Sequence, residues 1–363
     1  MIKIGLVGLP NVGKSSLFRF LTQKESKEGI ENYPFATIKP SHGIMPIPDF
    51  RLEKLAQDFQ SGKVTPSAIE WVDIAGLVKG AAQGLGLGNE FLSHIREVDL
   101  ICHVVRCFAG SNVEHVEKSV NPLRDYEIIQ SELILADLQQ IEKRKQKLQI
   151  LQKKQPQQAE KELKILTYLE QNLMNNCVLF QLKLTAEQKN PEWIQIIKSY
   201  NLLTVKPIII IANYNQEAEI KELENYAQEK QIYFFPLSVK DENDYLDLSV
   251  EEKKELGTDW KTTNLGLLAE KIKELLNLKV FFTAGPKETK SWLARKEMNA
   301  KQCAGLIHSD IEKGFVCVQV YNYQDWLIYP SEQQLSELGK IRSKGSQYII
   351  QEGDICHFLF SAR

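Results

Sequence analysis

Several features that define other classes of protein are missing from this sequence. It has no run of about 18 consecutive apolar residues, so no membrane-spanning helix is expected. Its six histidines are scattered, with no pair four residues apart, which disfavours a transition-metal site on a helix. Its six cysteines show no C-x-x-C spacing and mostly lie in apolar segments. They are therefore expected to be reduced, buried thiols of a cytoplasmic protein.

Charge and composition exclude little else. The 363 residues have a formal net charge of −2, and 43% of them are hydrophobic, which suits an ordinary globular protein with two or three domains. Met1 leads directly into a strand-like apolar run instead of a cleavable apolar core, so no signal peptide is expected.

The first sixteen residues are the most informative stretch of the chain. An apolar run over residues 2–7 opens into G-x-x-x-x-G-K-S over residues 8–15, the pattern of a phosphate-binding loop. Glycines at both ends of the loop let backbone N–H groups face phosphate oxygens. Lys14 is expected to reach the β- and γ-phosphates, and Ser15 to offer its hydroxyl to Mg²⁺. The predicted nucleotide-binding residues of this loop are Asn11, Val12, Gly13, Lys14, Ser15 and Ser16.

Two further segments supply parts that a nucleotide hydrolase needs. The mostly apolar residues 68–72 lead into Asp73-Ile74-Ala75-Gly76, a D-x-x-G sequence that predicts a carboxylate beside the metal and a backbone amide near the γ-phosphate. Thr37, which taken alone would be an ordinary loop hydroxyl, is predicted to complete the Mg²⁺ shell when the γ-phosphate is present. The predicted catalytic residues are Lys14, Thr37 and Gly76, and the predicted metal ligands are Ser15, Thr37 and Asp73.

A glycine-rich segment follows at residues 77–91. This density of glycine predicts a mobile switch loop, with a flexible linker as the alternative. Leu77 occupies the place where Ras-type enzymes carry a glutamine that orients water. The hydrolytic water must therefore be positioned by something else, such as backbone groups, a monovalent cation or a ribosomal group.

Base recognition is predicted after the apolar strand at residues 207–212. Guanine-specific enzymes read N-K-x-D there, whereas this chain has Asn213, Tyr214 and finally Gln216. A neutral amide cannot accept hydrogen bonds from both the ring N–H and the exocyclic amine of guanine, as a carboxylate does. Adenine is therefore the expected base. Ser238, at the end of the next strand, is expected to flank that base. The alternative for Asn213 is an ordinary turn residue at the end of a buried strand.

These motifs together resemble the YchF, or Obg-like ATPase, subfamily of the Obg-type P-loop NTPases over nearly all of the chain. The resemblance implies a preference for ATP over GTP, a hydrophobic residue at position 77, association with ribosomes, and stimulation by K⁺ with Asn11 as its ligand. One departure is Gln216, where family members usually carry Glu. The matching stretches are residues 5–16, 32–38, 73–78 and 103–108.

A helical insertion is predicted between residues 119 and 198. Apolar residues recur every seven positions on both sides of Pro156, which predicts two antiparallel helices. Residues 141–164 carry eight Lys or Arg against three Glu, so the tip is expected to be basic. Two interpretations of this basic charge stay open: a helix face exposed to solvent, and a surface that contacts rRNA phosphate. The seam residues are Ile134, Leu138, Ile141, Leu148, Leu151, Ala159, Leu166 and Leu173.

From about residue 278 short strands alternate with a helix near residues 303–308, and this part resembles the β-grasp TGS domain, which binds RNA or protein. Its aromatic residues fit either a core or a stacking platform; they are Tyr321, Tyr323, Trp326 and Tyr329. The predicted fold is α/β: a P-loop NTPase domain with a mostly parallel sheet (residues 1–118 plus 199–277), an inserted helical coiled-coil hairpin (119–198) and a TGS domain (278–363).

The leading functional hypothesis is a Mg²⁺-dependent ATPase switch acting on the ribosome. Its expected partners are ATP and the RNA and protein of the large ribosomal subunit, without a membrane or sequence-specific DNA. A GTPase translation or assembly factor and a non-catalytic RNA-binding scaffold are alternatives of other classes. A small-molecule kinase is disfavoured because the D-x-x-G and N-x-x-Q loops have no evident role in one.

Overall fold

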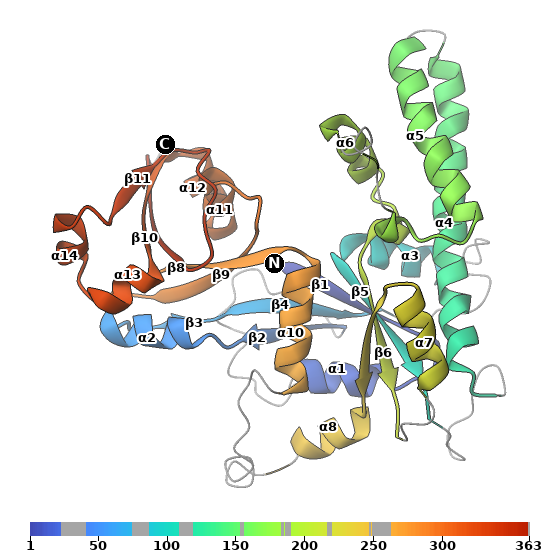
Figure 1. Ribbon diagram of the computed structural model, residues 1–363, viewed down its shortest axis with the longest axis horizontal. Coiled ribbons are helices and arrows are strands. Elements are labelled where there is room, and N and C mark those ends of the chain that lie inside the picture. Colours follow the sequence, from blue (N-terminus) through green and yellow to red (C-terminus); the bar gives the residue numbers. More distant parts are fainter. Residues whose placement is uncertain are drawn as a thin grey trace.

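The computed structural model contains two six-stranded sheets and a long helical pair (Figure 1). It describes residues 1–22, 41–74, 87–108, 119–152, 156–182, 185, 190–215, 220–246, 248 and 263–361, with the side chains at 87–90 and 246 left out. Among the described helices, none combines the length and the apolar character that a membrane crossing requires.

The first sheet is mostly parallel, as the sequence predicts. Its order is β2-β4-β1-β5-β6-β7, and only the edge strand β2 runs antiparallel to its neighbour. The inner strands are mostly apolar, and most of their residues are buried, because helices cover both faces of a parallel sheet. The strands are β1 (Ile2–Val7), β2 (His42–Ile47), β4 (Ser67–Asp73), β5 (Leu100–Arg106), β6 (Ile208–Asn213) and β7 (Tyr233–Leu237).

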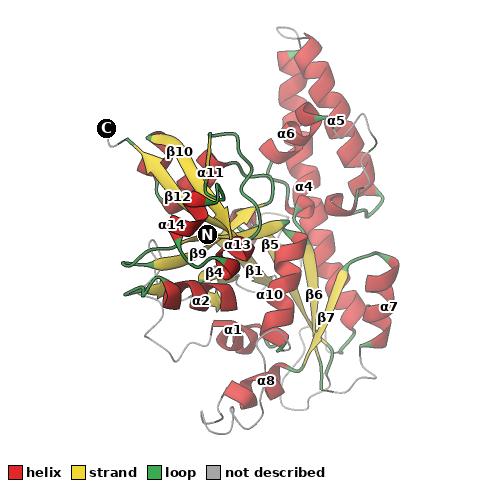
Figure 2. Ribbon diagram, turned by 60° about the vertical axis from the view of Figure 1, so that its left-hand side comes forward, coloured by secondary structure: helices red, strands yellow, loops and turns green. Residues whose placement is uncertain are grey.

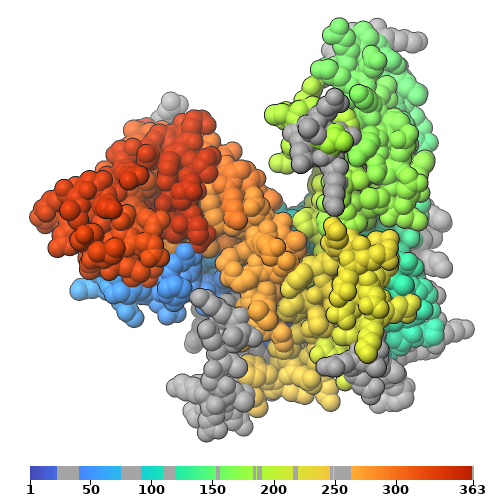
Figure 3. All heavy atoms as spheres, in the orientation of Figure 1, coloured from blue at the N-terminus to red at the C-terminus, as the bar shows by residue number. Residues whose placement is uncertain are grey.

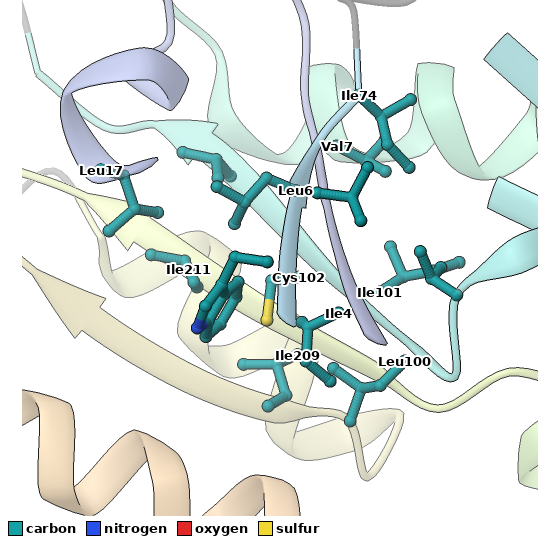
Figure 4. Packing of buried hydrophobic residues seen from close by; sticks show 14 of the residues in the cluster. Ile4, Leu6, Val7, Leu17, Ile74, Leu100, Ile101, Cys102, Ile209 and Ile211 are labelled. Carbon is teal, nitrogen blue, oxygen red and sulfur yellow. The ribbon is translucent and has the colours of Figure 1, made fainter. Parts of the chain in front are cut away.

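Side chains from these strands form the main hydrophobic core. Figure 4 shows Ile4 and Leu6 of β1 packed among Cys102 of β5 and Ile209 and Ile211 of β6, all of which are fully buried. The helices that accompany the sheet are α1 (Lys14–Thr22), α3 (Leu87–Glu97), α7 (Lys221–Glu229), α8 (Val239–Leu246) and α10 (Asn264–Leu275).

A helical pair projects from this sheet (Figures 1 and 2). It consists of α4 (Pro122–Leu151), which Asn121 caps, and the antiparallel α5 (Pro156–Met174), with α6 (Pro191–Ser199) beside them. Most of the predicted seam residues pack in one core cluster between the helices. Leu151 is the exception: it is 43% exposed, and α4 ends at this residue.

Residues 278–361, called the C-terminal module below, form most of the second sheet. Its order is β11-β10-β12-β8-β9-β3. Tyr321, Tyr323 and Trp326 are buried in its core, so the stacking-platform alternative is wrong for these three rings. The elements are β8 (Leu278–Thr283), β9 (Thr289–Arg295), α11 (Ala300–Ile307), α12 (Ser309–Lys313), β10 (Phe315–Asn322), α13 (Tyr323–Ile328), α14 (Glu332–Glu337), β11 (Arg342–Lys344) and β12 (Asp354–Phe360).

The chain between β2 and β4 completes this module. Strand β3 (Val64–Thr65) pairs in parallel with β9, and α2 (Phe50–Asp58) places Leu52 and Leu55 in the module's core. The Trp326 Nε1–H donates to Asp58 Oδ2 over 2.9 Å. The N-terminal part of the chain therefore crosses into the second sheet, an arrangement that no sequence pattern predicted.

In the space-filling view the C-terminal module and the helical pair stand as two separate masses that rise from the rest of the molecule (Figure 3). All six cysteines are free thiols; Cys177 and Cys317 are partly exposed and the other four are buried.

Candidate functional site

The phosphate-binding loop joins β1 to α1 and depends on glycine at two positions. Gly13 has a φ of +91°, and a Cβ there would lie 2.3 Å from the Nδ2 of Asn213. A Cβ on Gly8 would lie 2.6 Å from the carbonyl oxygen of Val104 in β5. Neither backbone carbon can carry a side chain in this geometry. The turn therefore brings α1 and its exposed N-terminal amides to the carboxyl end of β1, which favours an anion.

Asn213 fixes this loop to the far half of the sheet. Its Nδ2 donates to the Val12 carbonyl oxygen over 3.0 Å, and its Oδ1 accepts from the Val239 N–H over 3.2 Å. The residue is 6% exposed. Its amide thus ties together the phosphate-binding loop, the end of β6 and the start of α8. Tyr214 follows directly, and its N–H donates to the Leu237 carbonyl oxygen at the end of β7.

Lys14 and Asp73 bring opposite charges together at the mouth of the loop. The Lys14 Nζ lies 3.4 Å from Asp73 Oδ1 and donates a hydrogen bond to the Ile74 carbonyl oxygen. Burial lowers the pKa of the Lys14 ammonium, and the neighbouring Asp73 carboxylate opposes that shift. Asp73 Oδ1 is itself buried and accepts no hydrogen bond within the described structure. A carboxylate oxygen in this position can coordinate a metal cation or accept a hydrogen bond from the water molecules around it.

Helix α8 is fastened to α1 on the other side of the loop. Ser238 caps α8, since its Oγ accepts from the Asp241 N–H over 3.4 Å. The Asn243 Nδ2 donates to the Ser16 carbonyl oxygen over 3.1 Å and to the Val239 carbonyl oxygen over 2.7 Å. Sequence reasoning missed Asn243, because no motif marks a polar residue one turn inside a helix.

The described candidate residues converge at the carboxyl ends of neighbouring strands, where open α/β sheets bind ligands. Thr37, Gly76 and Gln216 lie outside the described residues, as does the glycine-rich segment up to residue 86. Their predicted roles toward metal, γ-phosphate and base stay predictions. The candidates that the structure places at this edge are Asn11, Val12, Gly13, Lys14, Ser15, Ser16, Asp73, Asn213, Tyr214 and Ser238.

Comparison with protein families divides the chain into two matched parts. Residues 3–136 match a family described as 50S ribosome-binding GTPase. Residues 278–361 match the family YchF-GTPase_C, described as a protein of unknown function (DUF933).

Full-length relatives cover both parts. The chain is 40% identical to the "Ribosome-binding ATPase YchF" of Bacillus subtilis, over 98% of each chain. It is 42% identical to the protein of the same name from Buchnera aphidicola, over 99% of each chain. The solved YchF GTPase structure of Schizosaccharomyces pombe superposes with a TM-score of 0.82 at 33% identity, covering 99% of this chain and 97% of that one.

Proposed function

Since this chain belongs to the YchF family, we propose that it is a ribosome-associated nucleotide switch of the cytoplasm that hydrolyses ATP in preference to GTP. The observation that carries the hydrolase assignment is the Lys14–Asp73 pair at the mouth of a glycine-dependent phosphate loop. The ribosomal assignment rests on the relatives, which are named as ribosome-binding ATPases.

In this proposal the chain positions a triphosphate mainly through backbone. The N–H groups of residues 13–16 and the N-terminus of α1 hold phosphate oxygens, and Lys14 adds a charge that tracks the β- and γ-phosphates. Lys14 lies beside Asp73 in the structure, and in this proposal it exchanges that carboxylate for phosphate when the nucleotide binds. The Asn213 clamp keeps the loop in register with the base-side residues Tyr214 and Ser238.

The donor set also fits Mg²⁺. Asp73 presents a buried carboxylate oxygen without a hydrogen bond, and carboxylate, hydroxyl and water oxygens are the ligands that Mg²⁺ prefers. Ser15, Thr37 and Asp73 would hold the ion. When bound, Mg²⁺ neutralises charge that develops on the phosphate oxygens.

Potassium is a further proposed cofactor, with Asn11 as its ligand in the phosphate loop. Asn11 lies next to the bound phosphates in this scheme, and its φ of 62° places it at a sharp bend of the loop. The test compares phosphate release in potassium and sodium buffers for the wild type and for Asn11→Ala. Equal wild-type rates in the two buffers would remove potassium from the proposal.

The second candidate function is a GTPase factor on the ribosome. It is favoured by the description of the matched family over residues 3–136 and by the name of the Schizosaccharomyces pombe structure. Gln216 argues for ATP, because an amide cannot replace the acceptor pair that guanine requires. Competition of ATP against GTP for the purified protein, measured by calorimetry, separates the two; tight GTP binding with no ATP binding would overturn the ATPase assignment.

Lys14→Ala tests the hydrolase assignment itself. We expect at least about a hundredfold loss of ATP hydrolysis, because the charge on the β- and γ-phosphates is removed. Lys164→Ala, an exposed lysine of α5, is the matched control and should hydrolyse ATP at the wild-type rate. Hydrolysis that survives Lys14→Ala would leave an RNA-binding scaffold as the better description of the chain. Co-sedimentation with ribosomes, with and without ATP, measures the association.

A further inference from the structure

A groove of about 490 Å³ lies where α3 meets α4. Its walls carry four cationic side chains, Arg96 from α3 and Lys143, Arg144 and Lys147 from α4. Amide, hydroxyl and phenol groups supply most of the remaining polar lining, and no described Asp or Glu lines the groove. The groove is therefore a concave surface of one charge in a chain whose overall charge is slightly negative.

The basic residues of the helical pair differ in how their charges are used. Arg144 is held by Glu162 over 2.7 Å, Lys145 by Glu170 over 2.6 Å and Lys161 by Glu192 over 3.2 Å. Lys143 and Lys147, by contrast, are exposed, lie one helical turn apart, and form no ion pair with any residue that the structure describes. Lys143 and Lys147 thus bring two positive charges without an ion-pair partner among the described residues to this groove, beside Arg96 and Arg144.

Resting on the proposed ribosomal function, we propose that this α3–α4 groove binds the phosphate backbone of RNA. Phosphate contacts in nucleic-acid complexes come from Lys, Arg, Gln, Ser and Tyr, which are the groups that line the groove. A protein partner would require aromatic or apolar anchors at the centre of the contact. Here the one aromatic ring, Tyr200, is engaged by Glu162 and Arg144.

The groove is rigid enough to present these charges in a fixed pattern. The Arg96 Nη1 donates to the Asn201 carbonyl oxygen over 2.9 Å, and the Asn201 Nδ2 donates back to the Arg96 carbonyl oxygen over 3.1 Å. On the α4 side, Gln140 Nε2 donates to the Tyr200 carbonyl oxygen over 2.6 Å. Because α3 follows Asp73 after residues 75–86, RNA in the groove contacts the helix next along the chain from the nucleotide site.

The experiment compares two charge-reversed proteins. Lys143→Glu/Lys147→Glu changes the groove, and Lys164→Glu/Lys198→Glu makes the same change in net charge on exposed lysines of α5 and α6. Binding of a labelled RNA duplex of about 16 base pairs is measured by fluorescence anisotropy. We expect the groove variant to bind about tenfold or more weakly, and its salt dependence between about 50 and 200 mM to lose about two units of slope. The control should stay within about twofold of the wild type.

Two results would overturn the proposal: an unchanged affinity of the groove variant, or an equal loss in the control, which would mean diffuse electrostatic attraction. Loss of ribosome co-sedimentation with unchanged RNA affinity would assign the groove to a protein partner instead. Lys143→Gln/Lys147→Gln, which removes charge without reversing it, repeats the test if the reversed variant does not fold. Calorimetric ATP affinity, expected to stay at the wild-type value, keeps this outcome separate from failure of the ATPase assignment.

Discussion

Position 13 requires glycine, because there is no room in the loop for a side chain. Its positive φ and its close approach to Asn213 both exclude a Cβ. The same Asn213 amide holds the Val12 carbonyl oxygen. The anion site is thus built by backbone shape, and its main side-chain support comes from a residue 200 positions further along the chain.

Gly13→Ala should therefore impair the site while leaving the rest of the fold intact. We expect ATP affinity to fall by about fivefold to about 150-fold, since the left-handed φ and the contact with Asn213 together cost about 1–3 kcal/mol in the binding-competent loop. Calorimetric titration with ATP measures the change. Gly345→Ala, where a Cβ meets nothing within 4 Å, is the control. Wild-type affinity in Gly13→Ala would show that the loop adopts another conformation when it binds.

His103 is a buried histidine that titrates far from its ordinary range. It lies in β5, 2% exposed, and stacks on Tyr126 with ring centroids 5.0 Å apart. Burial lowers its pKa to about 3 from 6.5. The unfolded chain therefore binds this proton near pH 6.5 and the folded chain does not, so stability falls as the pH drops from 6.5 toward 3.

His103→Phe should reduce this acid sensitivity. Phenylalanine keeps the stacking surface and removes the titration, so the free energy of unfolding should lose about 1.4 kcal/mol per pH unit of slope between about pH 4 and 6. Urea denaturation at several pH values measures the slope. An unchanged slope would mean that other groups dominate acid unfolding. His357→Phe, an exposed histidine of β12, serves as the comparison.

At the scale of elements, a buried carboxylate joins α4 to the turn that precedes β6. Asp137 is fully buried and accepts from the Leu203 N–H over 2.9 Å, the Thr204 N–H over 2.8 Å and the Thr204 hydroxyl over 2.7 Å. Burial raises its pKa, and these hydrogen bonds oppose the shift. Lys206 extends the junction by donating to carbonyl oxygens at the end of α3.

Asp137→Asn should weaken this junction. The NH2 group of asparagine would replace one of the two accepting oxygens and face a backbone N–H donor, so we expect a loss of about 2–3 kcal/mol in the free energy of unfolding. Urea denaturation measures the loss, and Glu142→Gln, on an exposed position of α4, should change stability by less than about 0.5 kcal/mol. A loss in both variants would point to a general effect of charge on α4.

At the scale of the whole molecule, local sequence patterns predicted the fold class. They did not predict that N-terminal elements pack with the C-terminal module. Apolar strands, the loop glycines and the heptad spacing each report their own element, which is why the parallel sheet and helical pair follow from sequence. The pairing of β3 with the second sheet and the packing of α2 in its core depend on contacts more than 200 residues apart, such as Asp58 with Trp326. The Arg96–Asn201 pair joins residues 105 positions apart and was missed because no local pattern reports such a contact, while Asn243 was missed because no motif marks it.

Leu55→Ala tests whether α2 shares a core with the C-terminal module. Leu55 is fully buried in the core it shares with Val280 and Phe282, so its truncation should cost about 2–5 kcal/mol. Hydrogen exchange should accelerate in β8, β10 and β12, although the substitution lies in the first 60 residues. Leu17→Ala, equally buried in the first core, should instead accelerate exchange in β1 and β4. Acceleration confined to the first sheet in Leu55→Ala would contradict the shared core.

The pairing of β3 with the C-terminal module also sets an order of folding events during synthesis. Translation delivers residues 50–65 early, but their partners in β8 and β9 follow only after more than 200 further residues. Through most of elongation α2 therefore carries an unsatisfied apolar face, the kind of exposed surface that chaperones shield in nascent multidomain chains. A stretch made late in synthesis is therefore the one that allows the early stretch to finish folding.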